Sequence, residues 1–101
     1  MASRADLQKE LETLLGSRNV YYQAPESVKM EYPAIRYKKS DIDTKHANNQ
    51  PYTHKRKYEI VVIDRKPDNP VIDKILKLPT SAWLQYYTAD NLHHDVLTLY
   101  Y

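Results

Sequence analysis

The leucines in the first 16 residues follow a helical spacing. They recur at i, i+4, i+7 and i+8, the pattern of one buried helix face, at Leu7, Leu11, Leu14 and Leu15. Ser3 and Asp6 have the spacing of a capping box at the start of such a helix, and Gly16 can end it in the left-handed conformation. We therefore expect a helix from Ser3 to Leu15 whose leucines pack into a core.

Two stretches after this helix have the pattern of strands. The first is the short Asn19–Gln23, and the second is Ala34–Ser40, in which Ile35 and Tyr37 alternate with basic residues. Such alternation is typical of a half-buried strand. Pro33 disfavours helix at the residue before it. Both stretches are therefore predicted to join a sheet.

The strongest strand pattern in the chain is Tyr52–Asp64. Its second half, Ile60–Ile63, is apolar on both faces, so we expect it to lie centrally in the sheet and to be covered by helices. The preceding segment Asp41–Pro51 is polar and contains Asn48 and Asn49, which favours a long loop. The sequence therefore predicts a long hairpin arm with this loop at its tip.

The last third of the chain predicts one helix and two strands. Asn69 can cap the helix with Pro70 at its first position, and Pro79 closes it. The strands are Ser81–Thr88 and His94–Tyr101, and the second runs to the last residue, which should tie the C-terminus into the sheet. The apolar helix face is formed by Val71, Ile72, Ile75, Leu76 and Leu78.

The predicted order of elements is α-β-β-β-α-β-β, which indicates a single α+β domain over residues 1–101. We expect a mainly antiparallel or mixed sheet of about five strands, with both helices on one face and the long hairpin between the second and third strands. The length suits one domain. Charged residues make up 28% and apolar residues 42% of the chain, as in ordinary globular proteins.

Composition excludes several classes of site. The chain has no Cys, so it can form neither a disulfide nor a Cys-ligated zinc site. Its one glycine excludes glycine-rich phosphate and dinucleotide loops. The N-terminal stretch lacks the apolar run of a signal peptide, and no segment approaches the ~20 apolar residues of a membrane-spanning helix. We expect no association with a membrane.

The histidines and serines do not form a recognisable catalytic or metal site. His93 and His94 are neighbours on a predicted strand and should point to opposite faces. His46 and His54 could approach each other across the hairpin but lack an obvious third ligand. The serines lie at predicted caps and loop edges, outside the turn that exposes a nucleophile. We therefore expect a protein that is not an enzyme and needs no metal or cofactor.

Basic residues gather along the predicted hairpin, where His54 to Lys57 are expected to face Lys38 and Lys39. Like charges opposed on a sheet repel, so the cluster favours an anionic partner. The alternative is a solvated arm whose lysines protect a strand edge. A small nucleic-acid-binding module is thus a second possible function, although the net charge is only +2. The candidate contact residues are Lys38, Lys39, Lys45, His54, Lys55, Arg56 and Lys57.

Aromatic residues are strongly biased, with ten Tyr, one Trp and no Phe. A Tyr ring is apolar, but its hydroxyl needs a partner or water, which suits partly exposed contact surfaces. Tyr is also enriched at protein interfaces. Our candidates for contacts between subunits are Tyr52, Tyr86, Tyr87, Tyr100 and Tyr101.

Several stretches together resemble the tail terminator proteins of long-tailed siphophages, also called tail completion or neck proteins. The likeness covers the chain from about Asn19 to its end and lies in phrases and element order, without a catalytic signature. The N-terminal helix matches in kind only. The stretches are Ala24–Tyr37, Asp41–Tyr52, Tyr58–Asp68, Ile75–Pro79 and Tyr86–Tyr101.

This resemblance implies an α+β fold and a ring of six copies at the head-proximal end of the tail tube. Such a ring ends tube polymerisation and offers the surface on which the head docks, and DNA passes through its lumen. The implied partners are further copies of the chain, the tail tube protein, a head-completion or neck protein and, transiently, DNA. The implied location is the virion's tail–neck junction, after assembly in the host cytoplasm. Another neck or head-completion protein is the alternative within this class.

A role in assembly would make the predicted loop at the hairpin tip a contact element, because long ordered loops usually touch something beyond their own domain. Its polar residues cannot join the core of their own domain. The assembly-loop candidates are Asp41, Ile42, Asp43, Thr44, His46, Asn48 and Asn49.

Overall fold

The computed structural model describes residues 4–23, 29–47 and 50–101, and for residues 41–47 and 50–55 it describes only the backbone. The predicted α+β class and element order are confirmed. The elements are α1 (Arg4–Leu15), β1 (Val20–Tyr22), β2 (Ala34–Ala47), β3 (Gln50–Asp64), α2 (Val71–Leu76), β4 (Ser81–Ala89) and β5 (Leu92–Tyr100).

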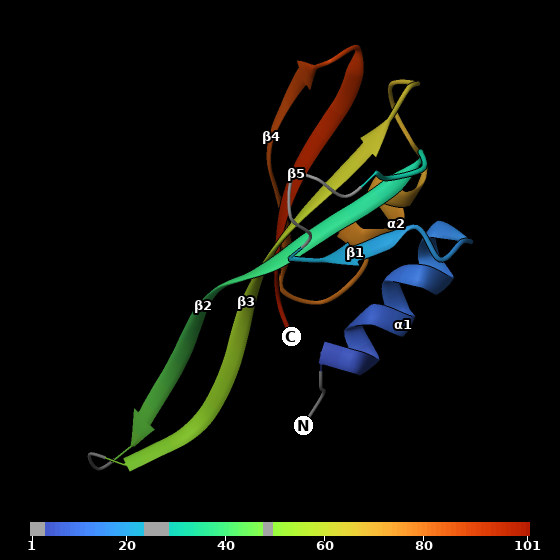
Figure 1. Ribbon diagram of the computed structural model, residues 1–101. Coiled ribbons are helices and arrows are strands. Elements are labelled where there is room, and N and C mark those ends of the chain that lie inside the picture. Colours follow the sequence, from blue (N-terminus) through green and yellow to red (C-terminus); the bar gives the residue numbers. More distant parts are fainter. Residues whose placement is uncertain (1–3, 24–28, 48–49) are drawn as a thin grey trace.

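The strands form one mixed sheet in the order β1-β2-β3-β5-β4. β1 runs parallel to β2, and the other neighbours are antiparallel. β3 is therefore central, as its apolar second half predicts. Both helices lie on the same side of the sheet (Figure 1), which confirms the expected two-layer arrangement.

The main core fills the space between the helices and the sheet. Leu7 and Leu11 of α1 are fully buried, and Leu14 and Leu15 pack against the same cluster, as the leucine spacing predicts. Complete burial of a leucine stabilises the fold by about 1.5–3 kcal/mol. The cluster's buried residues are Leu7, Leu11, Val20, Ile35, Tyr37, Tyr58, Ile60, Val62, Val71, Ile75, Leu97 and Leu99.

The opposite face of the sheet has a smaller core without a helix. Val61 and Ile63 of β3 are buried here with Val96 of β5, and Met30 and Tyr32 pack against them. Consecutive strand residues point to opposite faces, so Ile60–Ile63 is divided between the two cores. The expectation that helices cover this segment holds for one face only, because the chain before β2 covers the other.

Turn chemistry defines the ends of several elements. Gly16 has φ +79° and donates its N–H to the Glu12 carbonyl at 2.9 Å, so it ends α1 as expected. At the second helix, Pro70 occupies the cap position predicted for Asn69. The Asn69 side chain instead accepts the Val71 N–H at 2.9 Å, because Asn readily forms a turn with the residue two positions on.

The β4–β5 connection is tighter than the sequence predicts. Asp90 and Asn91 have φ values of 53° and 62° and form a two-residue turn between paired Ala89 and Leu92. Positive φ at both central positions is typical of the hairpin turn whose twist matches its strands. Beyond β5, the Tyr101 N–H donates to the Arg56 carbonyl at 2.9 Å. The C-terminus is thus tied to the sheet, as expected.

The predicted long loop over residues 41–51 is wrong. β2 continues to Ala47 and β3 begins at Gln50, so the backbones of the assembly-loop candidates Asp41, Ile42, Asp43, Thr44 and His46 belong to a strand. The hydrogen bonds of a ladder are made by the backbone and do not require apolar side chains. Asn48 and Asn49 lie outside the described residues, as does the predicted cap Ser3.

The long hairpin arm itself is confirmed. Figure 1 shows β2 and β3 running out together beyond the helices and the other strands. The molecule measures 51 × 23 × 23 Å, and its radius of gyration is 14.5 Å, against about 13 Å for a compact domain of this length. The backbone of the arm therefore extends past the helices that cover the rest of the sheet.

Candidate functional site: a hairpin arm and an exposed edge strand

The register of the arm separates the two groups of basic residues. Lys38 lies opposite Glu59 and Lys39 opposite Tyr58, so neither faces the basic run of β3. The Lys38 ammonium forms an ion pair with the Glu59 carboxylate at 3.8 Å, an exposed contact worth about 0–1 kcal/mol. The expectation that Lys38 and Lys39 face the basic run of β3 is wrong.

Farther along the arm, the register sets opposite charges across from each other. Lys57 pairs with Asp41, and Lys55 pairs with Asp43. Opposite charges at such register positions favour strand pairing. The argument for an anionic partner from repulsion between like charges therefore falls. The remaining candidates are aligned as Arg56 with Ile42, His54 with Thr44, and Lys45 with Thr53.

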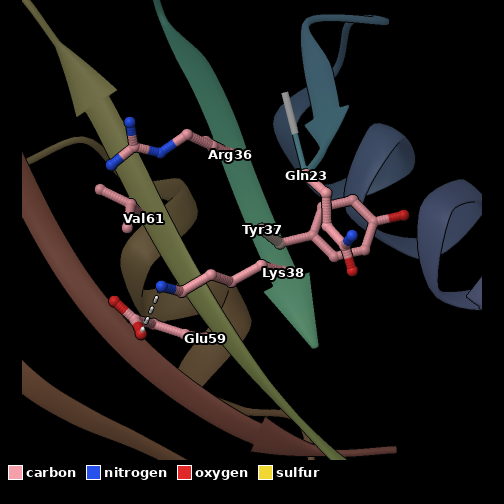
Figure 2. A pocket seen from close by; sticks show the side chains of 6 residues that line it. All are labelled: Gln23, Arg36, Tyr37, Lys38, Glu59 and Val61. Atoms are coloured by element: carbon pink, nitrogen blue, oxygen red, sulfur yellow. Dashed lines mark ion pairs between the residues drawn. The ribbon is translucent and has the colours of Figure 1, made fainter. Parts of the chain in front are cut away.

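A shallow groove of about 270 Å³ lies where the arm leaves the sheet. Figure 2 shows Arg36, Lys38 and Glu59 on one side of β2, while Tyr37 points to the other side, toward α1. The groove contains two cations and one carboxylate. Among the described residues that line it, none is a nucleophile paired with a base, as hydrolysis by covalent catalysis requires.

Two of the nine tyrosines whose side chains are described are core residues. Tyr37 and Tyr58 are 1% and 2% exposed, and burial is the main cause that raises the pKa of each hydroxyl. The Tyr37 hydroxyl donates to Gln8 Oε1 at 2.5 Å. The Tyr22 ring lies 5.0 Å from the Tyr37 ring, and the Arg4 guanidinium lies 4.3 Å above Tyr22. These rings attach α1 to the sheet.

The interface candidates fall into three groups. Tyr86 and Tyr87 on β4 are 46% and 37% exposed. Tyr100 and Tyr101 are half-buried; Tyr101 packs against the main core, and the Lys57 ammonium lies 5.9 Å from the Tyr100 ring centre. The side chain of Tyr52 lies outside the described residues. Only the β4 pair thus offers strongly exposed aromatic surface among the four that are described.

Sequence reasoning missed two further residues of this surface. Trp83 is 50% exposed and Leu84 is 58% exposed. With Tyr86 and Tyr87 they form the β4 patch, which holds four of the five exposed large hydrophobic residues identified among the described side chains. The sequence signal that could have identified them is the absence of charge along this strand, since β4 contains no Asp, Glu, Lys or Arg.

Residues of β5 support the rings of the β4 patch on both faces of the sheet. The Trp83 indole N–H donates to Asp95 Oδ1 at 3.1 Å. Tyr86 stacks on His93 with ring centres 5.9 Å apart, and its hydroxyl is hydrogen-bonded to His93 Nδ1. On the other face, Tyr87 stacks on His94 at 4.6 Å and 11°. The rings are therefore held in place before any partner arrives.

The histidine pair is thus engaged with aromatic rings on opposite faces of the sheet. His94 is also bonded through Nδ1 to the Leu92 carbonyl at 3.1 Å. No group of three or more metal-binding side chains occurs within the described part of the chain. In that same part, no helix combines the length and apolar character needed to cross a membrane.

Comparisons with known proteins do not assign a family. The chain matches no protein-family model, and no curated protein is significantly similar to it. The arm, the β4 patch and the resemblance of the sequence are therefore the features from which we infer a function.

Proposed function

We propose that this chain is a non-catalytic structural protein that forms a ring of identical subunits, six as the resemblance implies, at the head-proximal end of a phage tail tube. The observation that carries the proposal is the hairpin arm, which extends beyond the domain's own core (Figure 1). An exposed apolar strand at the sheet edge supplies a second, unlike surface. A ring needs such a pair, since one surface of each subunit meets a different surface of the next.

The ring would end polymerisation of the tube and present a surface to a head-completion or neck protein. Its partners would be the tail tube protein, that neck protein and further copies of itself, and DNA would pass through its lumen. The virion's tail–neck junction would be its location. No cofactor is part of this proposal.

The structure allows a sharp test of the arm. Ile42 and Arg56 face each other in the register, so residues 43–55 can be replaced by an Asn-Gly turn that joins this pair. The truncated chain should keep its fold, because the pairings of β1 with β2 and of β3 with β5 lie wholly outside the removed segment. Circular dichroism and thermal unfolding check this.

In cells infected by the phage that encodes this chain, the truncated protein should give tails of uncontrolled length or tails without heads. The intact chain supplied in trans is the control and should restore normal particles. Normal-length tails joined to heads, with the truncated protein present in them, would remove the arm's role and contradict the proposed function.

A further inference from the structure

The outer edge of β4 lacks the charged residues and proline that commonly protect an exposed strand. β4 is the last strand of the sheet, and within the described part of the chain its single strand neighbour is β5. Natural edges are commonly protected by charged side chains or proline, but Ser81–Ala89 contains neither. A register irregularity at Leu84, which is itself a feature that protects edges, leaves Gln85–Ala89 as the longer regular part of this edge. The edge is thus open to a further strand.

The β4 patch would hold such a strand from both sides. Tyr86 and Tyr87 project to opposite faces, and each is stacked on a histidine of β5. Trp83 and Leu84 extend the apolar surface along the same edge. Because the rings are already ordered, binding would cost less side-chain entropy than for mobile residues. Apolar area and backbone hydrogen bonds would both contribute.

A second free edge lies at the opposite side of the sheet. β1 pairs with β2 only from Ile35 to Tyr37. Beyond that, the outer edge of β2 from Lys38 to Ala47 has no strand neighbour among the described residues. This segment is similar in length to β4. Its charged residues, Lys38, Lys39, Asp41, Asp43 and Lys45, disfavour pairing with the same edge of another copy, whereas the uncharged β4 brings no like charge to it. Proteins commonly recognise one another by adding a strand of one chain to a free sheet edge of the other.

We propose that the outer edge of β4 pairs with the free edge of β2 in a second copy of this chain. This inference rests on the proposed function and specifies the contact between neighbouring subunits of the ring, which we call the β4–β2 joint. If β4 paired with β4 of a second copy, both edges would be used and the product would be a closed two-fold dimer that adds no further copy. Pairing β4 with an edge on the opposite side of the sheet repeats from copy to copy, which is the condition for a ring.

Disulfide trapping can test this arrangement, because the chain has no native Cys. Lys39→Cys on β2 is combined in turn with Ala82→Cys, Gln85→Cys or Thr88→Cys on β4. Tails are isolated from cells complemented with each variant, oxidised and separated without reductant. At least one pair should give a ladder of covalent oligomers, while each single-Cys variant stays monomeric.

A matched pair of lysine variants gives an independent measurement. Leu84→Lys places a charge in the β4 patch, and Leu76→Lys places one at the exposed large hydrophobic residue of α2, which is 39% exposed. Leu84→Lys should reduce incorporation into tails at least tenfold with an unchanged thermal midpoint. Leu76→Lys should be incorporated as well as the unmodified chain.

The outcomes distinguish the joint from the function. If the chain is present in tails of normal length but no pair gives a ladder, the β4–β2 joint is wrong and the function stands. A covalent dimer from Gln85→Cys alone would show two-fold pairing of β4 and also overturn the joint. If the unmodified chain is absent from tails, the proposed function falls, and the joint falls with it.

Discussion

The Gln8 side chain connects α1 to two strands, and its removal should have a measurable cost. Tyr37 on β2 donates its hydroxyl to Gln8 Oε1 at 2.5 Å. Gln8 Nε2 donates to the Val20 carbonyl of β1 at 3.0 Å and to Glu12 Oε2 at 2.9 Å. One amide therefore holds the helix against both strands of the parallel pair.

The magnitude follows from what each substitution removes. Tyr37→Phe keeps the ring, which is 1% exposed, so it creates almost no cavity and removes one hydrogen bond, worth about 1 kcal/mol. Gln8→Ala also leaves the Val20 carbonyl without this partner and should cost about 1–3 kcal/mol. Since the two changes remove the same bond, their coupling should be about 0.5–1.5 kcal/mol.

Urea unfolding of the wild type, both single variants and the double variant, followed by circular dichroism, measures this coupling. Tyr21→Phe is the matched control: the Tyr21 hydroxyl accepts an exposed bond of 3.5 Å from the Glu31 N–H, and its loss should stay within about 0.5 kcal/mol. Additive effects, with coupling below about 0.3 kcal/mol, would refute the Gln8 connection.

Three further predictions concern stability. The pKa values of Tyr37 and Tyr58 are raised in the folded chain, so their hydroxyls ionise at a lower pH when the chain is unfolded. Their contribution to the free energy of unfolding should therefore be complete below pH 10.0 and fall as the pH rises above it. Urea midpoints measured below and above pH 10.0 will test this. Gly16→Ala should cost about 1–2 kcal/mol through its positive φ alone, since nothing lies within 4 Å of the added carbon; the thermal midpoint measures this. Asn91→Ala should lower the free energy of unfolding, measured with urea, by a similar ~1 kcal/mol because Asn91 also has a positive φ, whereas Asn91→Gly should not.

Much of the fold could be predicted from local patterns. The leucine spacing identified Leu7 and Leu11 as core, and the apolar segment Ile60–Ile63 identified the central strand. These signals are strong because burial selects apolar side chains at the period of each element. The arm was harder to predict: its polar residues suggest a loop, yet they form a ladder whose hydrogen bonds come from the backbone.

The candidate site was only partly predictable for a related reason. Tyr86 and Tyr87 were identified from residue type, but Trp83 and Leu84 were not. In chain order, β4 precedes β5, and only the three-dimensional strand order places β5 inside and β4 at the edge. The opposition of Lys57 to Asp41 likewise depends on a register shift after Lys39, which the charge pattern does not reveal.

The strand order also divides the chain into two consecutive halves. Up to Asp64 the chain forms α1, β1 and the β2–β3 hairpin, and from Val71 it forms α2 and the β4–β5 hairpin. Both hairpins close locally, so the β3–β5 pairing is the long-range step of folding. Residues 65–68 between the halves are exposed. Two peptides divided there should reassemble into the native sheet, with the β3–β5 seam as the site of their association.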